Sequence, residues 1–114
     1  ARDRKQEALR LLEKAGSGDP EMLLSRANIL SEMNRADEAD RVLREIEAKW
    51  PEWDRAWVAH GILLERSHPA EAARKLRTAL ALGSRDPAAA CALARLAGSS
   101  AQSTAGTAAC SARQ

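Results

Sequence analysis

The sequence is poor in aromatic, cysteine and histidine residues and has no long apolar run. Of its 114 residues three are Trp, none is Tyr or Phe, two are Cys and two are His. No apolar stretch approaches the ~18 residues of a membrane span, and the opening ARDRKQ lacks the apolar core of a signal peptide. The 18 basic and 16 acidic residues are well mixed. We therefore expect neither nucleic acid nor a membrane as a partner.

The residue types needed for catalysis do not form a recognisable site. His60 and His68 have no metal-pair spacing, and Cys91 is the only conceivable third ligand. The sequence has no Gly-rich phosphate loop after a strand, because no strand is predicted. Its spacing also brings no nucleophile, base and orienting acid together. We expect a chain that is not an enzyme and has no cofactor or metal. Because it starts at Ala1 in place of Met, we also expect a piece of a longer protein or a processed product.

One amphipathic segment shows most clearly a pattern that the rest of the chain repeats. It is ADEADRVLREIEAKWP at 36–51. Its apolar residues Ala39, Val42, Leu43 and Ile46 follow the i, i+3, i+4, i+7 spacing that gathers side chains on one helix face. On the other face, acid-to-base pairs such as Asp40 and Arg44 are four residues apart. Such a helix needs similar neighbours to bury its apolar stripe.

Two interleaved series of such helices recur with a period of about 34 residues, which is typical of a helical repeat. In the first series, Glu38-Ala39 recurs upstream as Glu7-Ala8 and downstream as Glu71-Ala72, at nearly equal intervals. The apolar set of the first of these helices is expected to be Ala8, Leu11, Leu12 and Ala15. The second series is as regular and comprises Leu23, Ala27, Leu30, then Trp57, Gly61, Leu64, then Ala90, Ala94, Ala97. This periodicity predicts stacked helix-turn-helix units, each burying its neighbour's apolar face.

The repeated set resembles the tetratricopeptide repeat family, whose pattern places Trp, Leu-Gly and Tyr on one helix and Ala, Leu and Ala on the next. The matching residues here are Trp57, Gly61, Leu64, Ala72, Leu76 and Ala79, preceded by Leu23, Ala27, Leu30, Ala39, Leu43, Ile46 and Pro51. The chain departs from the pattern at Arg26 and His60, which occupy the Leu position. The resemblance implies an all-α fold, an α-solenoid of stacked antiparallel helix pairs forming a right-handed superhelix.

Helix ends follow from capping and turn residues. Asp19-Pro20 and Asp86-Pro87 are start signals, and Asp54 is expected to cap the helix that follows it. Asn34-Arg35 should form a tight turn, and Gly83 should close a helix. The predicted helices are 4–14, 20–33, 36–49, 54–66, 69–82 and 87–97. They form one repeat domain, 1–97, with a half repeat 4–17, repeats 20–53 and 54–86, and a partial repeat 87–97.

The resemblance also implies a function, namely that first-type helices line a concave groove that receives a peptide or a partner's helix. Carried over by position, the groove residues are Glu21, Leu24, Asn28, Ser31, Glu32, Arg55, Val58, Ile62, Glu65, Arg66 and Arg95. We therefore expect a protein interaction or scaffolding module. The alternative is a repeat segment of a larger enzyme that serves dimerisation or substrate placement. A homodimer through the uncovered helix 4–14, which carries Leu11 and Leu12, is also expected.

Residues 98–114 form either a poor last helix or a flexible tail, and the uncovered stripe of the preceding helix favours the helix. If the chain turns back near 98–100, Cys91 and Cys110 come to similar heights on antiparallel helices, which favours a disulfide between them. A free, buried Cys91 is the alternative. A bridged pair indicates a periplasmic or secreted protein, whereas two free thiols indicate the cytoplasm.

Overall fold

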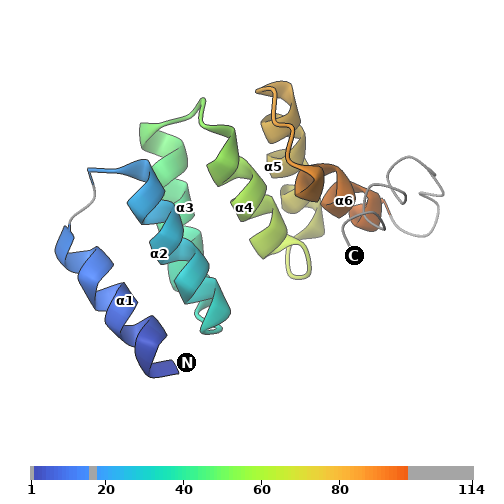
Figure 1. Ribbon diagram of the computed structural model, residues 1–114. Coiled ribbons are helices and arrows are strands. Elements are labelled where there is room, and N and C mark those ends of the chain that lie inside the picture. The colour runs from blue at the N-terminus through green and yellow to red at the C-terminus, as the bar shows by residue number, and fades with distance from the viewer. Residues whose placement is uncertain (1, 16–17, 98–114) are drawn as a thin grey trace. The chain divides into compact units, whose positions relative to one another are not determined.

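All regular structure in the computed structural model, which describes residues 2–15 and 18–97, is helical (Figure 1). The helices are α1 (Arg2–Ala15), α2 (Pro20–Glu32), α3 (Ala36–Lys49), α4 (Asp54–Leu64), α5 (Pro69–Ala81) and α6 (Pro87–Leu96). No strand occurs in the two described ranges. The prediction of an all-α chain is confirmed. The first and last residues of each predicted helix lie within two residues of those observed. The predicted last helix or tail at 98–114 lies outside the described residues.

Two helices begin with the predicted capping arrangement. The Glu21 amide donates to Asp19 Oδ1 at 2.9 Å, and the Ala88 amide donates to Asp86 Oδ1 at the same distance. In both helices Pro occupies the first turn, where its missing N–H costs nothing. The third predicted cap was wrong: Asp54 is the first residue of α4, and the N-cap is Trp53, which makes no side-chain capping bond.

Two helices end in the same left-handed turn. Asn34 has a φ of 62° and Gly83 a φ of 95°. After each, the next amide reaches back five residues: Arg35 N–H to the Leu30 carbonyl at 2.8 Å, and Ser84 N–H to the Ala79 carbonyl at 3.0 Å. These bonds satisfy carbonyl groups that the helix end leaves without a partner. Glycine takes this conformation without strain and Asn tolerates it, which is why these residues mark the two turns.

The chain divides into two compact units, Ala1–Pro51 and Glu52–Gln114. In the first unit, α2 and α3 lie side by side, and α1 packs against α2 (Figure 1). The predicted apolar faces of α2 and α3 form the core, which contains Leu23, Ala27, Leu30, Ala39, Val42, Leu43 and Ile46. A Lys5–Glu32 ion pair, with Nζ and Oε1 3.2 Å apart, also joins α1 to α2.

Helix α1 buries a residue that the predicted apolar set omits. Leu9 is 5% exposed and belongs to the core, whereas Leu11 is 62% exposed. The predicted apolar set omits Leu9, which is buried, and the exposure of Leu11 agrees with the expectation that this helix is left uncovered on one side. The reason is that α1 contacts a neighbour on one side only, so the position of α2 selects which residues are buried.

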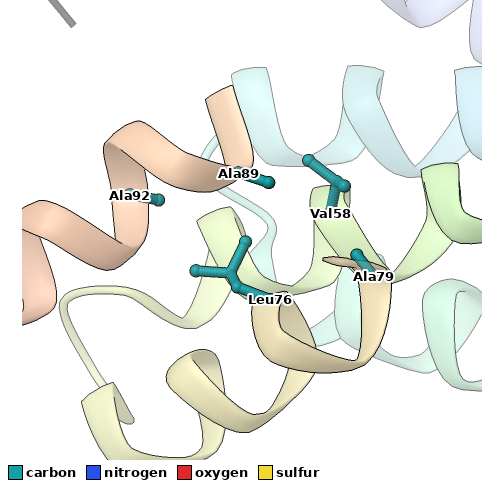
Figure 2. Packing of buried hydrophobic residues seen from close by; sticks show 5 residues of the cluster. All are labelled: Val58, Leu76, Ala79, Ala89 and Ala92. Atoms are coloured by element: carbon teal, nitrogen blue, oxygen red, sulfur yellow. The ribbon is translucent and has the colours of Figure 1, made fainter. Parts of the chain in front are cut away.

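In the second unit, α5 contacts both α4 and α6. Its core is built from small residues around Leu76, with Val58 from α4, Ala79 from α5, and Ala89 and Ala92 from α6 (Figure 2). Trp57, which the repeat pattern places on this helix, packs against the cluster and is partly buried. Small residues allow the backbones to approach: a Cβ added at Gly61 would lie 2.5 Å from Leu76 Cγ. His60 is fully buried in α4.

Candidate functional site

Most of the predicted groove residues fall on exposed helix faces. On α2, Glu21, Asn28, Ser31 and Glu32 are exposed, and on the second unit Arg55, Ile62, Arg66 and Arg95 are exposed, while Glu65 is half-buried. Leu24 and Val58, in contrast, are only 6% and 4% exposed. These two side chains belong to the core and offer no surface to a partner in this conformation.

A two-bonded ion pair brings together two of the predicted residues, Glu65 and Arg95, which are 30 positions apart. Arg95 Nε donates to Glu65 Oε2 at 2.6 Å, and Arg95 Nη2 donates to Oε1 at 2.9 Å. The planar guanidinium matches the carboxylate in this arrangement, which fixes the geometry of both groups. These hydrogen bonds raise the pKa of Arg95 above its ordinary value because they favour the charged form. The pair links the end of α4 to α6.

An exposed apolar side chain lies beside this pair. Ile62 is 40% exposed in the last turn of α4, and Glu65 and Arg66 follow it by three and four residues, just past the end of that helix. We call Ile62, Glu65, Arg66 and Arg95 the α4/α6 face. It combines an apolar side chain with charged groups of both signs held at a defined position.

In the first unit, a hollow of about 180 Å³ lies among α1, α2 and α3. Its apolar lining residues are Leu30 and Val42. The charged lining residues are Glu13, Arg26, Glu38, Arg41 and Glu45. The lining of the hollow is therefore mostly charged, in contrast to the apolar core of the same unit.

The charged groups around the hollow are partly held by ion pairs. Arg35 Nη2 donates to Glu38 Oε1 at 2.9 Å, and Arg35 Nε donates to Glu38 Oε2. These bonds lower the pKa of Glu38 and raise that of Arg35 because each stabilises the other's charge. Lys49 Nζ lies 3.2 Å from Glu45 Oε2. Two of the three lining carboxylates thus have a cationic partner outside the lining.

One side-chain atom of the lining residue Arg26 lacks a hydrogen-bond partner. Within 2–15 and 18–97, Arg26 Nε is the only buried side-chain nitrogen or oxygen without a hydrogen bond. A buried donor without an acceptor is unusual, since leaving one costs ~1–3 kcal/mol. The hollow was not among the predicted sites, although the sequence contains a signal for it. Arg26 places a charge at a repeat position where an apolar Leu is expected, and His60, at the same position of the next repeat, is fully buried.

The three Trp side chains are partly buried, and each has a cation near its ring. Lys49 Nζ lies 6.0 Å from the Trp50 ring centroid, and Lys75 Nζ lies 4.8 Å from that of Trp57. The Arg55 guanidinium carbon lies 5.3 Å from the Trp53 centroid. In these contacts a long cationic side chain lies near each ring. At exposed positions, the attraction between a cation and an aromatic ring is worth ~0.5–1 kcal/mol.

Neither a metal site nor a membrane helix is present in the described part of the chain. No group of three or more His, Cys, Asp or Glu is placed to hold a metal there. None of the described helices is long and apolar enough to cross a bilayer. Cys91 is 7% exposed on α6. Its predicted partner, Cys110, lies outside the described residues, so the disulfide stays a prediction.

Comparison with known proteins identifies no family. No protein-family model matches the chain, and no curated protein matches it. A function must therefore be inferred from the structure, in the first place from the α4/α6 face.

Proposed function

We propose that the chain is a non-catalytic binding module of tetratricopeptide-like repeats, which holds a peptide or a partner's helix on the exposed faces of its first-type helices. The proposal includes stacking of the repeats into a right-handed solenoid and a scaffolding role. It rests on the helix pairs, whose small residues and turns follow the repeat, and on the composition of the exposed faces. Its partner is a protein segment with an apolar anchor flanked by polar groups.

The observation that carries the proposal is the α4/α6 face. Ile62 leaves 40% of its surface in water although it directly follows the buried His60 and Gly61 in α4. Beside it, the Glu65–Arg95 pair presents a carboxylate and a guanidinium whose positions are held by two hydrogen bonds. Protein interfaces typically combine such an apolar anchor point with a polar rim. Because the rim is already ordered, a partner would lose little side-chain entropy on binding it.

The pair is suited to recognition more than to stability. Arg95 is 52% and Glu65 18% exposed at their side chains, and exposed ion pairs contribute only ~0–1 kcal/mol to folding. A partner that places its own charge beside the pair binds in a defined orientation. Its charge is attracted to the opposite charge of the pair, and it is repelled by the like charge when the partner is shifted along the face. The face therefore favours a segment that alternates apolar and charged residues.

A selection from a library of random linear peptides tests this function. Peptides enriched on the whole chain are then measured by fluorescence polarisation against the wild type, Ile62→Asp and Leu80→Asp. Leu80 on α5 is a matched control because it is also 40% exposed but lies outside the α4/α6 face. We expect Ile62→Asp to weaken binding about tenfold or more, as for a central interface residue, and Leu80→Asp to leave it unchanged.

Two outcomes would contradict the proposal. One is a failure of the wild-type chain to enrich any peptide above an unrelated helical protein. The other is equal loss of binding in Ile62→Asp and Leu80→Asp, which would indicate general adhesion to apolar surface. Circular dichroism of both variants should show the wild-type helix content, because both side chains are substantially exposed.

A further inference from the structure

The outer side of α5 carries an exposed stripe with two arginines at its centre. The stripe consists of Ala70, Arg74, Arg77 and Ala81. Their i, i+4, i+7, i+11 spacing aligns them along one side of the helix, and all four are exposed. The buried residues of α5 lie on the opposite side, where they pack against α4 and α6. We call these four residues the α5 stripe.

Neither arginine of the α5 stripe has an anionic partner in the described part of the chain. Arg74 and Arg77 form no ion pair with any residue of 2–15 and 18–97. Glu71 is the only acidic residue of α5, and its carboxylate pairs with neither of them. Each guanidinium offers five N–H donors. The stripe therefore presents two positive groups whose donors are not used by these residues.

The corresponding helix of the preceding repeat, α3, has two arginines at the same positions and an acid for each. When the Glu-Ala pairs of the two helices are aligned, Arg41 and Arg44 correspond to the two arginines of the α5 stripe. Asp37 and Asp40 precede them by four residues, the spacing at which an acid supports a base on a helix surface. One of these pairs is closed, with Arg44 Nε 2.8 Å from Asp40 Oδ2.

On α5 the positions of both acids hold alanine, namely Ala70 and Ala73. As a result α5 has one acidic and three basic residues, whereas α3 has five acidic and three basic residues. The arginines are thus present on both helices, but only α3 supplies carboxylates at the spacing that neutralises them. On α5 the positive charge is available to an anion from outside the chain.

The composition of the α5 stripe fits a helix of another protein better than a nucleic acid or a membrane. Alanines at both ends leave little side-chain bulk, so a second helix can approach closely. The planar guanidinium forms paired hydrogen bonds with a carboxylate. A membrane surface would need exposed large apolar side chains, and RNA would need aromatic rings on which its bases stack. The stripe has neither.

We propose that the α5 stripe binds an acidic helix of a partner protein, in which two Glu or Asp residues lie one turn apart. Arg74 and Arg77 are three residues apart, so their Cβ atoms are ~5–6 Å apart, and carboxylates one turn apart on the partner have a similar spacing. Each carboxylate accepts hydrogen bonds from one guanidinium, and the helix packs over Ala70 and Ala81. Because α5 is a second-type helix, this site does not rest on the α4/α6 face.

Three synthetic peptides of equal length test the assignment on the whole wild-type chain. Each is built from Ala and Gln and has about 16 residues, enough for a helix in water. One carries Glu at i and i+4, one carries Glu at i and i+2, and one carries Gln in place of Glu. The readout is the set of ¹H–¹⁵N backbone resonances of α5. We expect saturable shifts with the first peptide, about fivefold weaker binding of the second, and no shift with the third.

A pair of double variants separates the α5 stripe from charge in general. Arg74→Gln/Arg77→Gln should weaken binding of the i, i+4 Glu peptide about fivefold, as expected for two exposed ion pairs. Arg41→Gln/Arg44→Gln is the matched control, because it removes the same two charges at the equivalent positions of α3. It should bind the peptide like the wild type.

A third double variant restores the acids that α5 lacks. Ala70→Asp/Ala73→Asp keeps both arginines and places a carboxylate four residues before each, as on α3. We expect it to weaken binding of the Glu peptide as much as loss of the arginines does. Raising NaCl from about 0.05 M to 0.3 M should also weaken this binding, because exposed charges are screened.

Four outcomes would overturn the assignment. They are equal binding of the Glu and Gln peptides, an equal loss of binding in the α3 and α5 arginine variants, no shift of α5 resonances with any peptide, and tighter binding of phosphatidylserine vesicles or of a single-stranded oligonucleotide than of the Glu peptide. The last outcome would assign the arginines to lipid or nucleic acid. Ile62→Asp should bind the Glu peptide like the wild type, so this proposal and the proposed function can fail separately.

Discussion

Gly61 lies where the backbone of α4 faces α5, and it has no room for a side chain. An added Cβ would lie 2.5 Å from Leu76 Cγ, 2.7 Å from Leu76 Cδ2 and 3.1 Å from the Ala72 carbonyl oxygen. Leu76 is fully buried and the Ala72 oxygen is backbone, so neither can move aside freely. The absence of a side chain at this position therefore sets how close the two helices lie.

Gly61→Ala should destabilise the chain. Alanine favours a helix over glycine by ~1 kcal/mol, but overpacking a filled core typically costs ~1–3 kcal/mol, so we expect a net loss. Denaturant unfolding followed by circular dichroism measures it. Gly18→Ala is the control, because nothing lies within 4 Å of its added Cβ. A gain in stability from Gly61→Ala would mean that α4 and α5 are not in this close contact.

The charged Glu38 carboxylate should stabilise the folded chain at neutral pH and lose this effect at acid pH. Hydrogen bonds from Arg35 lower its pKa in the folded chain, so the folded state binds this proton less tightly than the unfolded state. Its contribution to stability is therefore present above the unfolded pKa and is lost as pH falls through the folded one. We expect Glu38→Gln to lower the Tm near pH 7, and the difference from the wild type to shrink below about pH 4.

Thermal melts of wild type and Glu38→Gln at several pH values measure this difference. Glu52→Gln removes an exposed carboxyl from the segment between α3 and α4 and controls for the loss of one acidic group. A difference that stays constant or grows on acidification would show that the Arg35–Glu38 pair does not act through the charge of the carboxyl.

Among the helices, α3 is the clearest case of an element determined by its own sequence. Its predicted and observed bounds are the same, and Ala39, Val42, Leu43 and Ile46 are all buried. The expected pair on its outer face is also present, with Arg44 Nε 2.8 Å from Asp40 Oδ2. Strong amphipathic periodicity specifies such a helix because burial of its stripe needs no other information.

Leu43→Ala should cost ~2–5 kcal/mol, because it removes a large side chain from a filled core. Leu43 is 2% exposed in the wild type. Leu80→Ala on α5 makes the same chemical change at a residue that is 40% exposed, and we expect less than ~1 kcal/mol there. Urea unfolding of both variants gives the comparison. Similar losses in the two variants would place Leu43 outside the core.

Other elements show where prediction from sequence reaches its limit. The start of α4 was misassigned because Asp54 is a good cap by type, and only the backbone shows that Trp53 holds the cap position. The core residue Leu9 of α1 was missing from the predicted apolar set, because Leu9 and Leu11 are equally apolar and the neighbouring helix decides which of them is buried. Local preference identifies helices well, but it does not fix the rotation of a helix with one neighbour.

At the scale of the whole molecule, the two candidate surfaces depend on packing that no short stretch of sequence specifies. The Glu65–Arg95 pair requires α6 to lie against α4, and its residues are 30 positions apart. Both were predicted at groove positions, but their bond was not. The hollow requires three helices at once, and its one signal in the sequence is Arg26, a charged residue at a repeat position where Leu is expected.

The covalent state of the two cysteines remains a prediction for the whole chain. We predict a Cys91–Cys110 disulfide, which would close a loop of about 19 residues and stabilise the chain by ~3 kcal/mol. Cys91 is buried, so titration needs denaturant. Protein isolated from its native compartment without reductant should show no free thiol. Two free thiols would contradict the bond and the oxidising compartment that it implies.

The order of helix contacts has a consequence for how the chain folds. In the described residues of each unit, helices pair with their neighbours along the chain, and α4 with α6 is the one pair that is not consecutive. Chains dominated by contacts between neighbouring segments fold in ~µs to ms, because little loop entropy is lost before the first contacts form. The helix pairs α2–α3 and α4–α5 can therefore form as soon as their own residues have left the ribosome. Docking of α6 onto α4 has to wait for α5, so the Glu65–Arg95 bond is expected to form late in folding.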